Sequence, residues 1–273
     1  MRPGLQDLPE PAELHARLTA RHPLDWGNPI PTKAELAAHH GAEATTRSLT
    51  LLVQAADAEQ QVTHQILAAG GADIVAHQLQ SRVKSPHSLA RKLRDLRRSG
   101  LAKAPIDDVL RYTLVTPHPD DLVDAAEHAC QELTRRGCVL SRAMHSYTDG
   151  NRYKGLHLLL RSHGQRLELQ IHSRESIDVK HRTTPLYIVE RDREQPKDKR
   201  SAARAAAIAI SAAMSHPAGI DELKTLGGVP VEVRVYGRQK GRPTHREDPA
   251  AAQTHAEPAA PTYSTGRKDG LSR

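Results

Sequence analysis

A seven-residue stretch of strict alternation, residues 166–172, constrains the fold of this chain most strongly. It places Glu168, Gln170 and His172 on one face of a strand and aliphatic side chains on the other. Residues 156–161 form a second strand-like run, and the short connection at residues 162–165 predicts an antiparallel hairpin. Such a polar face most often meets water. The alternative is that it carries chemistry, and the rest of the sequence decides between the two.

The pattern of the whole chain predicts a mixed α/β fold, with a mixed β-sheet flanked by helices and a helical N-terminal extension. Further strands are expected at residues 109–116, 139–144 and 229–236, and helices at residues 11–20, 119–136 and 199–215. The predicted divisions are a loosely ordered lead-in (1–32), a helical region packed on the core (33–80, broken at Gly70-Gly71), an α/β domain (81–236) and a disordered tail (237–273).

Composition excludes several classes of protein. No apolar run approaches the ~18 residues of a membrane span, and the N-terminus lacks the features of a secretory signal. Two cysteines, Cys130 and Cys138, are too few for a disulfide framework, so a cytoplasmic location is expected and both are interpreted as structural. The 17 histidines lack metal-ligand spacing with Cys or acidic residues, which disfavours a zinc site.

Positive charge is concentrated at residues 81–105, which hold eight Lys and Arg residues against one carboxylate. Ser85 and Pro86 predict a helix start, with extended backbone before it and Arg82 and Lys84 on one face. Ser88 and Lys92 are four residues apart, on a different face from the leucines of the helix and near its anion-attracting N-terminus. The stretch therefore predicts a site for nucleotide phosphates or nucleic acid, the alternative being a solvated charged helix.

Phosphoryl or pyrophosphoryl transfer needs cations for the phosphates, carboxylates for a magnesium ion and a proton acceptor for the attacking hydroxyl. The sequence offers all three kinds: Asp108 precedes a predicted strand, and Tyr153 and His157 border the face of Glu168. There is no Gly-rich loop ending in Gly-Lys-Ser or Gly-Lys-Thr, so a P-loop fold is not expected.

The order and spacing of these motifs over residues 82–190 resemble the RelA/SpoT alarmone synthetase domain, in its small single-domain branch. The motifs are Arg82-x-Lys84-x-x-x-Ser88-x-x-x-Lys92, then Asp108, then Tyr153-x-Gly155-x-His157, then Glu168-x-Gln170-Ile171-His172-Ser173. The resemblance implies a nucleotidyltransferase-like fold and an enzyme that transfers pyrophosphate from ATP to a ribose 3′-hydroxyl of GDP or GTP, with Mg²⁺ as cofactor. The His-Asp pair of the family's hydrolase domain is absent, because no histidine is followed by Asp.

The resemblance also implies roles for individual residues. The residues implied for ATP are Arg82 near the adenine, the phosphate-binding Lys84 and Lys92, Ser88 and Arg111. Those implied for the acceptor nucleotide are the stacking Tyr153, Lys154, His157 and Gln170. Asp108 and Glu168 are the implied metal ligands, and the catalytic set is Glu168, Asp108 and Lys92.

The chain departs from the family at several positions. It reads Asp108-Val-Leu-Arg111-Tyr-Thr113, whereas family members usually show Asp-x-x-Gly-x-Arg. Our hypothesis is that Arg111 substitutes for the missing guanidinium; an Arg111→Ala protein with unchanged ATP affinity contradicts it. Arg152 replaces a glycine before the tyrosine, which puts guanine specificity in question. Thr184 stands where toxic relatives usually have His, and Ile188 where they have Glu.

Two rival functions remain open at the level of sequence. One is a toxin that pyrophosphorylates the 3′ end of tRNA, which the basic stretch would also suit. The other is a catalytically weakened nucleotide- or RNA-binding module, against which Glu168 argues because binding needs no carboxylate there. A cognate antitoxin and assembly into a homo-oligomer are likewise open, and no membrane partner is expected.

Overall fold

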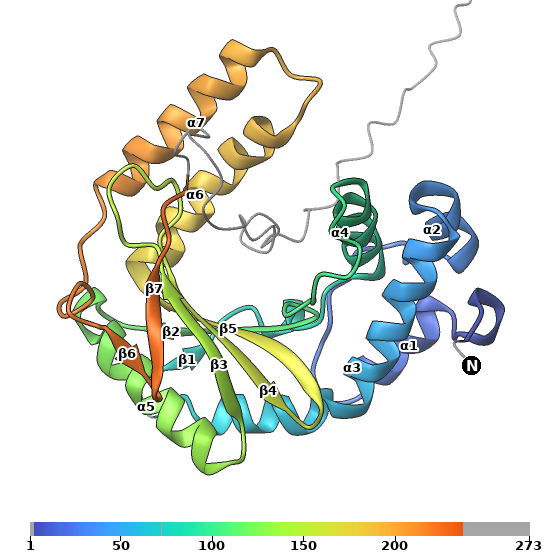
Figure 1. The fold of residues 1–273 in the computed structure, drawn as a ribbon, viewed down its shortest axis with the longest axis horizontal. Coiled ribbons are helices and arrows are strands. Elements are labelled where there is room, and N and C mark those ends of the chain that lie inside the picture. Colours follow the sequence, from blue (N-terminus) through green and yellow to red (C-terminus); the bar gives the residue numbers. More distant parts are fainter. Residues whose placement is uncertain (1–2, 72, 237–273) are drawn as a thin grey trace, which may run out of the picture.

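The computed structural model describes residues 3–71 and 73–236. Their core is a seven-stranded mixed sheet in the order β1-β2-β5-β4-β3-β7-β6 (Figure 1). β2 runs parallel to β5 and β3 parallel to β7, whereas the other neighbours are antiparallel. The predicted mixed α/β fold is therefore confirmed. The tail predicted at residues 237–273 lies outside the described residues.

The longer strands of the structure are the ones that the sequence pattern predicts. Those predicted from alternation and apolar runs are β2 (Leu110–Thr116), β3 (Val139–His145), β4 (Leu156–Ser162), β5 (Gln165–Ser173) and β7 (Val229–Val233). The two-residue strands β1 (Val75–Ala76) and β6 (Thr225–Leu226) were not predicted, because two residues carry no periodicity. β4 and β5 form the predicted hairpin, and its two turn residues, His163 and Gly164, both have positive φ.

The helices lie on both sides of this sheet. They are α1 (Pro11–Thr19), α2 (Lys33–His40), α3 (Ala42–Ala68), α4 (Pro86–Arg98), α5 (Leu122–Arg135), α6 (Arg174–Arg191) and α7 (Lys197–Ala212). Short 3₁₀ turns occupy Leu5–Asp7, Leu79–Ser81 and Pro119–Asp121. The sequence did not predict α6, which starts directly after β5 and contains Pro185. Within the described residues, no helix is long and apolar enough to cross a membrane.

The start of α4 is as predicted and brings the cationic stretch to the sheet. The Ser85 hydroxyl accepts a hydrogen bond from the backbone N–H of Ser88 at 3.3 Å, and Pro86 is the first helical residue. Before the helix, the backbone N–H of Lys84 donates to the carbonyl of Val109 at 2.9 Å. This contact places the Lys84 residue beside the segment that leads into β2.

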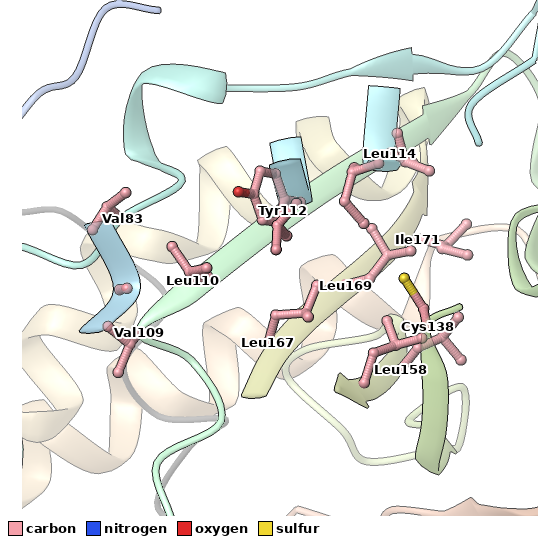
Figure 2. Close-up of a cluster of buried hydrophobic side chains, with 14 of the residues drawn as sticks. Val83, Val109, Leu110, Tyr112, Leu114, Cys138, Leu158, Leu167, Leu169 and Ile171 are labelled. Carbon is pink, nitrogen blue, oxygen red and sulfur yellow. The ribbon is translucent and has the colours of Figure 1, made fainter. Parts of the chain in front are cut away.

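The sheet has an apolar face and a polar face. On the apolar face, the leucines of β2 and β5 pack together (Figure 2), and the Tyr112 hydroxyl lies 2.8 Å from Thr63 of α3. On the polar face, Lys180 of α6 donates to Gln170 of β5 at 3.2 Å. Figure 1 accordingly shows α3 and α5 on one side of the sheet and α6 on the other. The polar face of the predicted hairpin is thus covered by a helix rather than left to water.

The lead-in segment differs from the loosely ordered segment that we expected. Leu14 and Leu18 of α1 and the single tryptophan, Trp26, are buried in the main hydrophobic core. The Trp26 Nε1 donates to the carbonyl of Val83 at 3.0 Å, directly before Lys84. Prolines hid this packing from pattern analysis, because they interrupt the helical spacing without preventing burial.

Candidate active site

Asp108 anchors a buried cluster of charge at the start of β2. Lys84 Nζ lies 3.0 Å from its Oδ2, and Lys92 Nζ donates to its Oδ1 at 2.8 Å. All three side chains are at most 5% exposed. Burial raises the pKa of Asp108, but Lys84 and Lys92 together outweigh it and hold that pKa well below its ordinary value. Burial lowers the pKa of Lys84 to about 8, although Asp108 opposes the shift. The cluster therefore consists of two buried amines that share one buried carboxylate.

Arg82 lies apart from this cluster. It follows a 3₁₀ turn rather than continuing a strand, and its guanidinium points into the interior. There it pairs with Glu59 of α3 and donates to the carbonyls of Leu18 and Pro23, both at 2.7 Å. The structure thus gives Arg82 contacts that hold the N-terminal segment to the domain, and does not bring it together with Lys84 as the sequence predicted.

Glu168 occupies the centre of the polar face, opposite Arg111 of β2 in the parallel register. Its Oε1 accepts hydrogen bonds from His157 Nδ1 at 2.6 Å and Gln170 Nε2 at 3.1 Å. Its Oε2 is buried and accepts no hydrogen bond from the described residues. Burial raises the pKa of Glu168, but the hydrogen bond from His157 and the charge of Arg111 bring it below the ordinary value. The charge of Asp108 opposes that decrease, so the two carboxylates interact.

Arg111 connects the two parts of the site electrostatically. Its charge lowers the pKa of Asp108 and of Glu168, and also that of Lys84. The other cations implied for phosphates come from α4 and the segment before it, whereas Arg111 comes from β2. Arg111 is thus close enough to affect both carboxylates, and its role toward a nucleotide stays a prediction.

Three of the four predicted acceptor residues, Tyr153, His157 and Gln170, belong to one hydrogen-bonded network, which also contains Glu168 and His172. The Tyr153 hydroxyl lies 2.8 Å from His157 Nε2 and 3.0 Å from His172 Nε2, and His172 Nδ1 lies 2.9 Å from the Ser176 hydroxyl. Burial lowers the pKa of His172 and raises that of Tyr153, so both are neutral at pH 7. The Glu168 carboxylate can only accept, so His157 Nδ1 donates to it. In a neutral imidazole, His157 Nε2 then accepts from the Tyr153 hydroxyl. The Tyr153 oxygen in turn accepts from His172 Nε2. The tyrosine ring is therefore fixed while its side chain remains only partly buried.

Lys154 and Ser88 lie at the margins of these groups. Lys154 is buried next to Tyr153 in the chain, but it is not hydrogen-bonded to Tyr153, His157 or Gln170. Ser88 is half-buried in the first turn of α4, one turn before Lys92.

Arg152 connects the loop before Tyr153 to α6. Its Nε lies 2.9 Å from Glu190 Oε2, and its guanidinium lies 4.3 Å from the centre of the Tyr187 ring. Its backbone carbonyl accepts from the Ser211 hydroxyl of α7 at 2.7 Å. Arg152 thus ties the segment before Tyr153 to the α6–α7 pair.

Gly155 allows Tyr153 and His172 to meet. A Cβ at this position would lie 2.8 Å from Cε1 of His172 and 2.9 Å from Oη of Tyr153. We expect Gly155→Ala to push the two rings apart and to cost ~1–3 kcal/mol of stability through overpacking. Urea unfolding measures this effect. The further change His172→Ala should relieve part of the loss, and an unaltered stability in Gly155→Ala contradicts this account.

The donor set partly fits a magnesium ion. Among the described residues, no group of three or more His, Cys, Asp and Glu side chains could hold a metal. Mg²⁺ in phosphate-transfer sites, however, commonly takes one or two carboxylates together with substrate phosphates and water. Glu168 Oε2 has open lone pairs and fits this need directly. Asp108 could be a ligand of Mg²⁺ only if Lys84 and Lys92 were paired with another anion, because they occupy both of its oxygens.

Fold and site together define a mixed α/β domain in which two buried lysines pair with Asp108 and a second buried carboxylate, Glu168, has one open oxygen. A scan against models of known families finds no match, and a search of the curated proteins finds none either.

Solved structures similar to this chain include small alarmone synthetases from Bacillus subtilis. Synthetase 1 bound to its product pppGpp matches with a TM-score of 0.38 and 13% identity, over 59% of this chain and 88% of that chain. A second structure of synthetase 1 matches with a TM-score of 0.38 and 17% identity, over 61% of this chain and 89% of that chain. Synthetase 2 from Bacillus subtilis matches with a TM-score of 0.37 and 15% identity, over 59% of this chain and 88% of that chain. At these TM-scores the likeness carries no argument about activity, which therefore rests on the residues of the site.

Proposed function

We propose that the protein is an ATP-dependent pyrophosphokinase that transfers the β,γ-pyrophosphate of ATP to the ribose 3′-hydroxyl of GDP or GTP, the reaction of (p)ppGpp alarmone synthesis. The observation that carries the proposal is Glu168, a buried carboxylate with one oxygen fully engaged and the other open, on the sheet face next to the Asp108 cluster. The proposed setting is the cytoplasm, with nucleotides as substrates.

The lysine cluster would bind the triphosphate of ATP. In the structure, Asp108 pairs with both Lys84 and Lys92, so the two buried amines share one carboxylate. Phosphate oxygens can replace the carboxylate as partners of these amines. Asp108 is then available to Mg²⁺, whereas the open oxygen of Glu168 is left for the proton of the acceptor hydroxyl. When bound, the ion would neutralise charge on the phosphates.

Glu168 would act as the base. Its Oε1 already accepts two hydrogen bonds, so Oε2 is the atom that takes the proton of the 3′-hydroxyl. The 3′ oxygen forms a bond to the β-phosphorus of ATP while the bond from that phosphorus to the α,β-bridging oxygen breaks, and AMP leaves. Because the pKa of Glu168 lies below its ordinary value, the carboxylate is ionised at neutral pH and Oε2 has a lone pair for that proton.

The acceptor base would stack on Tyr153. The hydroxyl of this tyrosine is held by His157 and His172, so its ring is pre-oriented and loses little freedom on binding. The same network connects the ring to Glu168 through His157. Recognition of the acceptor and activation of its hydroxyl are therefore coupled through one histidine, and Lys154 lies next to this ring in the chain.

Transfer of label from γ-labelled ATP tests the proposal, with GDP, GTP, ATP and bulk tRNA offered separately and Tyr153→Ala and Glu168→Ala as controls. Label on GDP or GTP that is lost in both variants is the expected result. Label on tRNA alone would replace the proposed acceptor by the tRNA 3′ end, and the protein would then be a translation-blocking toxin with a place for a cognate antitoxin. Transfer to none of these acceptors, with binding retained, would favour the nucleotide-binding module.

A further inference from the structure

Lys180 is a cation of the polar face that none of the recognised motifs contains. It lies on α6 and is partly exposed, and its Nζ donates to Oε1 of Gln170 at 3.2 Å. Within the described part of the chain, no carboxylate is within ion-pair distance of this amine. An ordinary surface lysine is paired or fully hydrated, whereas this one is directed at a buried amide.

The contact with Lys180 fixes the orientation of the Gln170 amide. Gln170 is fully buried, and its amide has one acceptor oxygen and one donor nitrogen. Lysine can only donate when charged, so Oε1 must face Lys180 and Nε2 must face Glu168. The nitrogen then donates to Glu168 Oε1 at 3.1 Å. The reversed amide would place its oxygen against the carboxylate and its hydrogens against the amine, which is unfavourable at both ends.

The orientation of Gln170 decides which oxygen of Glu168 is open. Oε1 receives both the Gln170 amide and His157, whereas Oε2 receives neither. We propose that Lys180 is a positioning residue, which holds Glu168 Oε2 toward the acceptor hydroxyl by fixing the amide of Gln170. The catalytic consequence rests on the proposed function, whereas the orientation of the amide does not.

The environment of Lys180 is consistent with this role. Burial and the charge of Arg111 lower the pKa of Lys180 to about 7, and the charge of Glu168 opposes that decrease. Because an ammonium and a neutral amine both carry N–H donors, the contact with Gln170 persists on either side of this pKa. The role assigned to Lys180 is therefore that of a hydrogen-bond donor.

Kinetics of five variants test the catalytic consequence. Lys180→Met removes the donor at similar length, Lys180→Arg keeps it, and Lys199→Met removes one charge from an exposed position of α7. We expect Lys180→Met to lower kcat about tenfold without changing the KM for ATP, Lys180→Arg to restore most of kcat, and Lys199→Met to match the parent protein. When Gln170 is already replaced by Met, the further change Lys180→Met should leave kcat at the value of the Gln170→Met protein. The proposal would be overturned if Lys180→Met lowered kcat as much in the Gln170→Met protein as in the parent protein. It would also be overturned if Lys180→Met alone left kcat unchanged.

A measurement without turnover separates this proposal from the proposed function. The side-chain amide signal of Gln170, assigned by its disappearance in Gln170→Met, is recorded by nitrogen-edited NMR on the nucleotide-free protein. We expect slowly exchanging, inequivalent amide protons in the parent and in Lys180→Arg, and faster exchange in Lys180→Met. An unchanged signal in Lys180→Met overturns the positioning role whatever the transfer assay gives. Absence of transfer by the parent, together with a released amide in Lys180→Met, would overturn the proposed function and leave the positioning of Glu168 standing.

Discussion

Glu168→Gln should lower the kcat of pyrophosphoryl transfer by about 10²–10⁴-fold, the range for loss of a general base, while the KM for ATP stays within about twofold. The amide oxygen can occupy the place of Oε1 and keep the hydrogen bonds from His157 and Gln170. The amide nitrogen then occupies the place of Oε2 and cannot accept a proton. Steady-state kinetics with saturating acceptor measure the effect.

A matched control for this variant is Glu132→Gln, which removes a carboxylate from α5, away from the polar face. It should leave kcat unchanged. Circular dichroism and urea unfolding should show Glu168→Gln folded, since the substitution preserves shape. A kcat close to that of the parent protein in Glu168→Gln would show that another group accepts the proton.

Asp108→Asn should destabilise the nucleotide-free protein by ~3–5 kcal/mol, the usual cost of removing one partner of a buried charge cluster. The two amines at Asp108 are almost completely buried, and a neutral amide cannot compensate them. Urea unfolding measures the change. The combined variant Asp108→Leu, Lys84→Met and Lys92→Met removes all three charges, so it should be close to the parent in stability although it no longer binds ATP.

The stability difference between the parent protein and Asp108→Asn should depend on pH in one direction. The pKa of Asp108 is depressed in the folded state, so its contribution is complete above the ordinary pKa of an aspartate, about 4. It declines as the pH falls from there toward the folded value. The contribution of the Asp108 carboxylate to the difference should therefore shrink as the pH falls below about 4. An Asp108→Asn protein as stable as the parent at pH 7 would contradict the buried cluster.

The sheet could be predicted from sequence because its main strands carry long signals. The alternation around Glu168 and the turn at residues 162–165 define the β4–β5 hairpin, and with it the side-by-side placement of His157 and Gln170. The start of α4 was predictable for a similar reason, since Ser85 and Pro86 are local signals. Interactions that depend on residues close in sequence are therefore the ones that pattern analysis recovered.

The partners of individual charges could not be predicted in the same way. Arg82 belongs to the same cationic motif as Lys84, yet its partner is Glu59, on a helix whose position against the sheet is decided by tertiary packing. The lysines were assigned to ATP phosphates and Asp108 to a metal, but in this structure they pair with one another. Only the fold shows which charges compensate each other without a ligand.

Lys180 and Arg152 were missed as structural parts of the site for a related reason. Both act through α6, whose apolar residues do not repeat at helical spacing and which contains Pro185. Without that helix, nothing in the sequence pattern placed Lys180 beside Gln170 or Arg152 beside Glu190. Gly155, in contrast, belongs to a motif that the sequence analysis singled out, and the absence of a side chain there leaves room for His172 and Tyr153.

The most direct test of the central claim is the fate of both labels when the protein is given β-labelled or γ-labelled ATP with its preferred acceptor. Pyrophosphoryl transfer predicts that both labels reach the acceptor and that AMP forms in equal amount. Transfer of the γ label alone, with ADP as the other product, would contradict the account, because the lysine cluster and Glu168 would then serve simple phosphoryl transfer.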